Sequence, residues 1–206
     1  MENTYNDSAQ KNFEFIKNAC GITADIEFFS TEYNYKYREV TEEQASAGLL
    51  TGIWDNLGVV KNDGHAPATV FAMPWNIFAL ESSDHNYGLS LQQDPWIPTM
   101  RGKVLQMVLN ITSGMQFVSL DPYGTGVYVL RGNGKKLWVW QNRNKWTNIY
   151  LNSFTLTDIP AGATNIFVYS WNGLMKIVPV NGQTEVEIND LQKEQTYMFL
   201  CQDMIN

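Results

Sequence analysis

Apolar residues follow a helical period at two places in the first 60 residues. The first is 7–20, where Asp7 can cap the helix, Gly21 can end it, and Phe13, Ile16 and Cys20 share one face. The second is 42–57, which Thr41 begins with a capping box and Gly58 ends. Its apolar stripe consists of Ala45, Leu49, Ile53, Trp54 and Leu57. We therefore predict two N-terminal helices.

Shorter apolar segments lie between and after these helices. Residues 24–30 predict a strand, and 33–38 predict a second one. The second would place Tyr33, Tyr35 and Tyr37 on one face, which suits either half-buried packing or a binding surface. Residues 61–100 contain four of the seven prolines, so we expect an ordered wrap of short strands and loops there.

The period changes from about 3.6 to 2 near residue 101, and apolar runs then recur every 8–12 residues or so. Turn residues such as Asn172-Gly173 and Asn181-Gly182 separate the runs. The runs are 103–111, 115–120, 126–131, 136–141, 146–151, 153–159, 165–171, 174–180, 184–189 and 195–201. This pattern predicts a β-dominated α+β fold, with the two helices followed by an antiparallel β-sandwich or barrel-like body. The expected regions are 1–60, 61–100 and 101–206, as separate units or as one integrated domain.

Composition and charge narrow the class of protein. The chain has 206 residues, of which 44% are hydrophobic, 13% aromatic and only 17% charged, which excludes disorder as its main state. A net charge of −7 argues against nucleic acid and anionic membranes as partners. The charge is uneven, because 1–46 holds 9 acids and 4 bases, whereas 122–157 holds 5 bases and no acid. The basic region indicates either a solvated strand face or a patch for an acidic partner.

The two cysteines and the N-terminal residues indicate the cellular compartment in which the chain is made. Cys20 and Cys201 lie in apolar surroundings, so we expect buried free thiols, with a bridge between them as the alternative. The start of the chain has no secretory signal pattern, and no apolar run reaches membrane-spanning length. These features predict synthesis in a reducing cytoplasm.

Known catalytic and cofactor motifs are absent from the sequence, so we expect no enzyme activity, metal or cofactor. A nucleophile set of Cys20, Asp84 and His85 can be drawn, but neighbouring Asp and His side chains rarely orient each other. A glycosidase needs two carboxylates. Candidates on expected strands are Glu27, Glu185 and Glu187, of which the last two alternate as solvent-facing residues do.

The strongest candidate surface lies in 131–150. Trp138 and Trp140 would share one strand face, with Leu137 and Val139 on the other. Arg143, Trp146 and Tyr150 would follow on a neighbouring strand. These aromatic residues suit a sheet core, a protein interface or a glycan platform, and the sequence leaves all three open.

Residues 158–173, Asp-Ile-Pro-Ala-Gly-Ala-Thr-Asn-Ile-Phe-Val-Tyr-Ser-Trp-Asn-Gly, resemble a strand-turn-strand phrase found in β-rich phage tail-fibre and virion proteins. The resemblance implies a structural role in a particle and transfers no site residues. Together with the acidic, motif-free, aromatic-rich composition, it predicts a non-enzymatic virion component of the neck, tail or fibre attachment.

This role implies other virion proteins as partners, a homo-oligomer and a place in the virion after assembly in the host cytoplasm, with the cytoplasm as the alternative. Two further functions stay open. One is a carbohydrate-binding module or lectin that uses surface aromatics on a glycan, and the other is an unrecognised hydrolase.

Overall fold

The computed structural model describes residues 9–33, 41–61, 67–74, 78–79, 89–91, 97–120, 127–142 and 151–202. Its helices are α1 (Ala9–Ala19), α2 (Glu42–Leu57) and α3 (Met100–Thr112). Its strands are β1 (Phe28–Tyr33), β2 (Thr69–Pro74), β3 (Phe78–Ala79), β4 (Ser90–Leu91), β5 (Ile97–Pro98), β6 (Gln116–Leu120), β7 (Val127–Gly132), β8 (Lys135–Asn142), β9 (Phe154–Leu156), β10 (Asn165–Ser170), β11 (Gly173–Pro179), β12 (Val186–Ile188) and β13 (Gln195–Gln202). The predicted β-dominated α+β class is confirmed.

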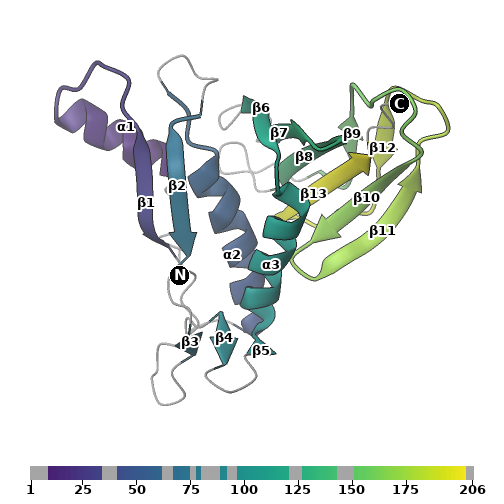
Figure 1. Cartoon of the computed structure of the whole chain (residues 1–206), viewed down its shortest axis with the longest axis horizontal. Helices are drawn as coiled ribbons and strands as arrows, with labels where there is room; N and C mark the ends of the chain where they lie inside the picture. The colour runs from purple at the N-terminus through teal and green to yellow at the C-terminus, as the bar shows by residue number, and fades with distance from the viewer. Residues whose placement is uncertain are drawn as a thin grey trace.

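The elements form successive layers (Figure 1). Strands β1 and β2 make a parallel pair on one side, and α2 and α3 lie between this pair and a six-stranded antiparallel sheet. The order in that sheet is β11-β10-β13-β8-β7-β6, so it stays open, with β11 and β6 as its edges. The two-stranded sheet β12-β9 packs on the far face of the six-stranded sheet. The short strands β3, β4 and β5 form a further, three-stranded sheet beyond one end of α2 and α3.

Helix α2 forms as the sequence predicts. Thr41 accepts a hydrogen bond from the backbone N–H of Gln44, whose side chain accepts one from the backbone N–H of Thr41. The predicted stripe is buried, with Leu57 partly so. Thr51 also reaches the six-stranded sheet, because its hydroxyl lies 2.8 Å from that of Thr196. The helix is therefore held by apolar packing and by a buried polar contact.

Helix α1 forms where predicted but buries a different face. Phe13 is buried, whereas Ile16 is 54% exposed and Cys20 is exposed, so the expectation that both cysteines are buried is wrong for Cys20. The helix is oriented by Gln10, whose side chain accepts a hydrogen bond from the Val60 N–H at 2.7 Å and donates one to the Val60 carbonyl. This polar anchor sets which face turns inward. Cys20 and Cys201 are not joined by a disulfide, so the alternative of a bridge between them is wrong.

Helix α3 replaces the strand predicted over 103–111, and that prediction is wrong. Its buried residues include Val104, Val108 and Ile111, which recur every three or four positions. Thr99 caps the helix by accepting a hydrogen bond from the Gly102 N–H at 3.1 Å. The buried residues of this run therefore follow a helical period, although its shortness and apolar composition are also typical of a strand.

Later runs mostly form the predicted strands. They correspond to β6, β7, β8, β9, β10, β11, β12 and β13. Most of the run 146–151, and all but Tyr33 of the run 33–38, lie outside the described residues. Within the described part, no helix is long and apolar enough to cross a bilayer.

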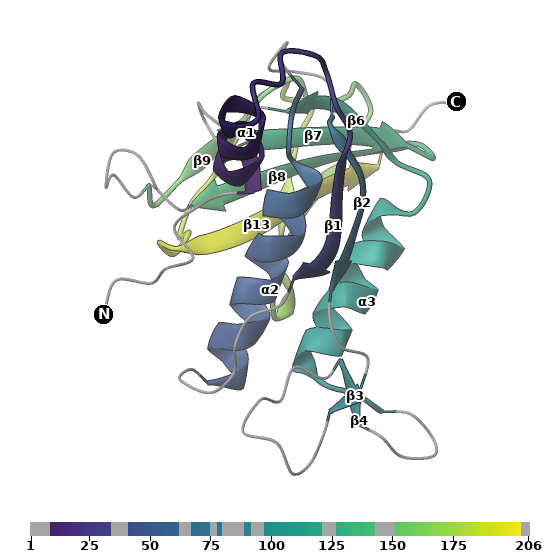
Figure 2. The same cartoon turned by 90° about the vertical axis from the view of Figure 1, so that its left-hand side faces the viewer.

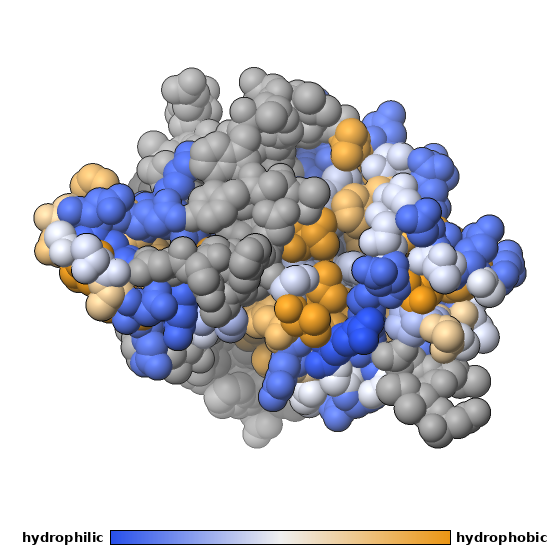
Figure 3. All heavy atoms as spheres, turned by 90° about the horizontal axis from the view of Figure 1, so that it is seen from above, coloured by the Kyte–Doolittle hydropathy of each residue, from blue (hydrophilic) through white to orange (hydrophobic). Residues whose placement is uncertain are grey.

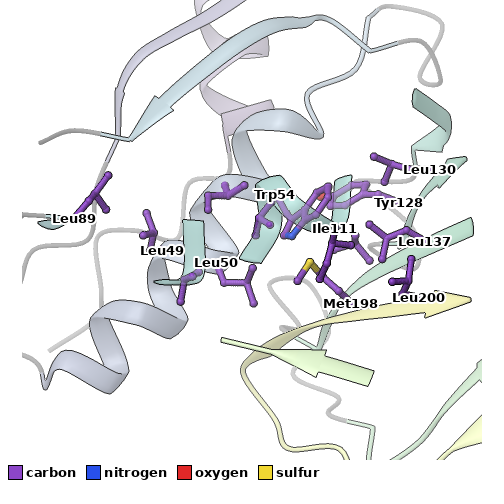
Figure 4. Packing of buried hydrophobic residues seen from close by; sticks show 14 of the residues in the cluster. Leu49, Leu50, Trp54, Leu89, Ile111, Tyr128, Leu130, Leu137, Met198 and Leu200 are labelled. Atoms are coloured by element: carbon purple, nitrogen blue, oxygen red, sulfur yellow. The ribbon is translucent and has the colours of Figure 1, made fainter. Parts of the chain in front are cut away.

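Strands β8 and β13 are buried on both faces. Leu137 and Val139 pack with α2 and α3, where Trp54 and Met198 also lie (Figure 4). Trp138 and Trp140 face the two-stranded sheet instead, and each is 4% exposed. The structure therefore places both tryptophans in the core, and neither forms the candidate binding surface. Removing either ring would cost about 3–5 kcal/mol.

Stacked aromatic rings join the two sheets on that face. The Trp140 ring lies 4.7 Å from that of Phe154, and the Phe154 ring lies 5.7 Å from that of Phe199. Tyr197 stacks on both Trp140 and Phe199. Its hydroxyl accepts a hydrogen bond from the Gln192 N–H at 2.7 Å and donates one to the Gln192 carbonyl at 3.4 Å. Burial raises the pKa of Tyr197 above its usual 10.0, and the Gln192 contact offsets part of this rise.

Replacing Tyr197 with phenylalanine tests this hydroxyl. At neutral pH, Tyr197→Phe should lose about 1 kcal/mol of unfolding free energy, because the hydrogen bonds to Gln192 are lost. The raised pKa makes the wild-type contribution fully present below about pH 10 and lost as the pH rises further, since the unfolded state ionises first. Urea unfolding at several pH values should therefore show the gap between the two proteins narrowing in alkali. A gap of constant size would contradict this account.

Candidate functional site

The candidate site lies at the carboxyl end of the parallel pair. Strand β1 leads through α2 into β2, and the two strands run side by side in the same direction (Figure 2). This is a β-α-β unit, and ligands bind outside the carboxyl ends of strands in sheets built from such units. Both arrowheads point toward the end of the molecule where β3, β4 and β5 lie (Figure 1).

Glu32 is the acidic residue at this end. It is the fifth of the six residues of β1, and among the residues of β1 and β2 it is the only acid. The register is irregular just there, because β1 advances three residues from Ser30 to Tyr33 while β2 advances two from Ala72 to Pro74. An irregularity of this kind is common next to active sites. Its position in the strand and the irregular register together make Glu32 the candidate functional residue of this site.

The helices that begin at this end are tied to each other. Arg101, in the first turn of α3, is 1% exposed, and its Nε donates to a carboxylate oxygen of Glu42 at 3.2 Å. Glu42 is the first residue of α2. A buried Arg needs such a partner, because an unpaired charge inside a protein is costly. The ion pair therefore fixes the two helix starts relative to each other.

The neighbouring residue Glu43 stays ionised. Its pKa lies below the usual value because its own backbone N–H and the Thr41 side chain hydrogen-bond to its carboxylate. Negative charge is favourable at the start of a helix. Glu42 and Glu43 thus stabilise the start of α2.

A close backbone contact holds the segment before α3 at the same end. Thr99 donates its N–H to the Leu89 carbonyl at 3.0 Å, and Leu89 is buried in the core beside α2 and α3. A Cβ on Gly102 would lie 1.9 Å from that carbonyl oxygen. Only glycine permits this approach. The first turn of α3 therefore fixes β4 beside the candidate site.

The residues that the sequence suggested for catalysis do not converge here. Glu27 is exposed and precedes β1, so it lies at the opposite end of the strand. Glu185 and Glu187 are exposed at β12, as the solvent-facing interpretation predicts. Cys20 is exposed beyond α1. Within the described part, these four residues lie at three different elements, the start of β1, β12 and the end of α1.

The remaining candidates lie largely outside the described residues. This applies to Tyr35, Tyr37, Asp84, His85, Arg143, Trp146 and Tyr150. Tyr33 ends β1, next to Glu32. Glu32 itself was missed, because the predicted strands 24–30 and 33–38 placed a break where β1 continues. The available signal was a strand, a helix and a second strand in succession, with an acid at the end of the first.

Comparison with known proteins gives a fold and no family. No protein-family model and no curated protein matches the sequence. A GH30 endoxylanase from Clostridium papyrosolvens C71 aligns over 98% of this chain and 47% of its own, with a TM-score of 0.52 and 14% identity. The glycoside hydrolase family 30 subfamily 8 xylanase Xyn30A from Clostridium acetobutylicum aligns over 85% of this chain and 42% of its own, with a TM-score of 0.52 and 14% identity. The chain thus spans less than half the length of either structure.

These findings correct two predictions. The expected non-enzymatic virion component is contradicted, because two solved structures that share the fold are xylanases. The expectation that the chain has no enzymatic role is contradicted on the same ground. The open hydrolase alternative fits the comparison better. The predicted location in a virion has no support.

Gly102 provides a test of the geometry beside the site. Helix propensity alone predicts that Gly102→Ala stabilises the protein by about 1 kcal/mol. The contact with Leu89 predicts a loss of about 1–3 kcal/mol instead, because the added methyl group would displace β4 or α3. Chemical denaturation measures the difference. Lys103→Ala, on the next and exposed residue, is the control and should change the unfolding free energy by less than about 0.5 kcal/mol. A stabilised Gly102→Ala protein would refute the close approach.

Proposed function

We propose that this chain is part of a glycoside hydrolase and that Glu32 is one of its two catalytic carboxylates. The observation that carries the proposal is the place of Glu32 at the carboxyl end of a parallel strand, next to an irregularity in register. The fold that the chain shares with two xylanases supports it.

The parallel pair has the form of a piece of a larger sheet. Parallel sheets in proteins are buried on both faces, and two strands alone are marginally stable in water. In the described part of the chain, β1 and β2 pair only with each other, so each has a free edge. We infer that further parallel strands, in polypeptide outside this chain, complete a β/α barrel around the site.

The chemistry follows from the pairing of carboxylates. A glycosidase places two carboxyl groups on opposite sides of the glycosidic bond, one to protonate the leaving oxygen and one to attack the sugar or to activate water. Glu32 supplies one of them. The second comes, in this proposal, from a strand that completes the barrel. The substrate class is a polysaccharide or glycoside with an accessible glycosidic bond.

The antiparallel sheets support the site in this proposal. One face of the six-stranded sheet packs on α2 and α3, and the other face packs on the β12-β9 sheet. Because α2 also packs on β2, the six-stranded sheet fixes the helix that joins the two parallel strands. Its role is to hold the catalytic face rigid.

The test replaces Glu32 in the native protein or complex that contains this chain. Hydrolysis of xylan and of aryl glycosides by Glu32→Gln should fall about 10²–10⁴-fold, because the amide can neither transfer a proton nor attack. Glu27→Gln, an exposed position at the opposite end of β1, is the matched control and should keep wild-type activity.

Two results would refute the proposal. One is a folded Glu32→Gln protein that keeps its hydrolytic activity. The other is a native protein that hydrolyses none of these substrates. Circular dichroism of both variants establishes that the fold is retained.

A further inference from the structure

Strands β9 and β12 cover only part of one face of the six-stranded sheet. A groove crosses the part of that face that they leave uncovered. Its volume is about 560 Å³, within the usual range for ligand-binding clefts. The floor is made by β6, β7 and β8, and one wall by β9 and the residues after it. The lining residues are Val118, Ser119, Val127, Val129, Arg131, Lys136, Trp138, Phe154, Thr155, Leu156, Thr157 and Asp158.

The wall of the groove is the edge of a strand. Five consecutive residues, 154–158, line it, whereas a strand seen face-on contributes only every second residue. One edge of β9 pairs with β12. In the described part of the chain, no strand pairs with the opposite edge, which forms the wall of the groove. A free edge of this kind presents backbone donors and acceptors to a further strand.

The floor is apolar and accessible. Val118 is 60% exposed, although it is a large hydrophobic residue in a strand. Val127 and Val129 are only partly buried. Figure 3 looks onto the end of the molecule where β6, β7 and β9 lie and shows apolar residues near the middle, with strongly hydrophilic ones to their right. An exposed apolar surface of this kind marks a site of interaction.

One end of the groove carries two cations. Arg131 and Lys136 lie directly opposite each other on β7 and β8, an arrangement that is unfavourable for like charges. Lys136 is 4% exposed, and its Nζ donates to the Asp158 carbonyl at 2.6 Å and lies over the Trp138 ring. Arg131 is exposed, and no carboxylate in the described part pairs with it. In a chain of net charge −7, this end attracts an acidic group.

We infer that this groove binds an extended peptide strand, from polypeptide outside this chain, which pairs with the free edge of β9 and places a carboxylate against Arg131. The strand-edge wall and the apolar floor favour a peptide over a sugar, since Trp138 is too buried to stack on a sugar ring. Apolar side chains at alternate positions of the peptide would face Val118, Val127 and Val129. This site is separate from Glu32, and the inference holds whether or not the chain belongs to a glycosidase.

The test titrates the whole chain with a defined probe. The probe is the end-blocked peptide Glu-Thr-Val-Thr-Val-Thr-Val, together with its reversed sequence, because either strand direction can pair. Isothermal titration calorimetry should show saturable binding of one of them. Amide hydrogen exchange, followed by NMR, should slow at Thr155, Leu156 or Thr157 when the peptide is present.

Charge variants separate specific binding from general stickiness. Exchanging the glutamate of the probe for lysine, or introducing Arg131→Gln, should weaken binding about tenfold. Lys103→Gln removes one charge from an exposed position on α3 and should leave affinity unchanged.

Three outcomes would overturn the inference. The first is that neither probe binds, and the second is binding without slower exchange at β9 or without dependence on the glutamate. The third is a dimer in analytical ultracentrifugation whose β9 amides are already protected, because the occupant would then be a second copy of this chain.

Discussion

The whole architecture depends on burying both faces of strands β8 and β13. Their side chains are apolar on each side, so neither face can be left to water. Helices α2 and α3 cover one face through Leu50, Ile53, Val104 and their neighbours, and the β12-β9 sheet covers the other through stacked aromatics. Burial of both faces explains why α2, which joins the two strands of the parallel unit, also packs together with α3 on an antiparallel sheet. Helix α2 therefore shares one cluster of buried residues with the antiparallel sheet.

The same demand positions both sites that we propose. Because α2 is held by the six-stranded sheet, the start of α2 is fixed, and Arg101 fixes the start of α3 against it. The carboxyl ends of β1 and β2 meet that fixed end of the helices. At the other side of the molecule, β9 and β12 are too few to cover six strands. The uncovered part over β6 and β7 is the groove.

The sequence reveals local structure better than long-range placement. The capping residues of α2, the turn glycines and the alternating runs after residue 115 predict the corresponding elements well, because their signals are local. Helix α3 was not predicted, because the run that contains Val104, Val108 and Ile111 is apolar enough to be taken for a strand. Whether Trp138 and Trp140 lie in the core depends on β9 and β12 packing over them, which no local pattern specifies. Glu32 carries no motif around it, so its interest arises only from the parallel pairing of β1 with β2.

In our proposal, strands β1 and β2 are a piece of a larger parallel sheet that carries a catalytic carboxylate. Amide hydrogen exchange measures this most directly, by comparing the chain alone with the native protein or complex that contains it. In the chain alone, amides of β1 and β2 should exchange far faster than those of β8 and β13, and in the larger assembly they should become comparably protected. Equal protection of both pairs in the chain alone would contradict the claim.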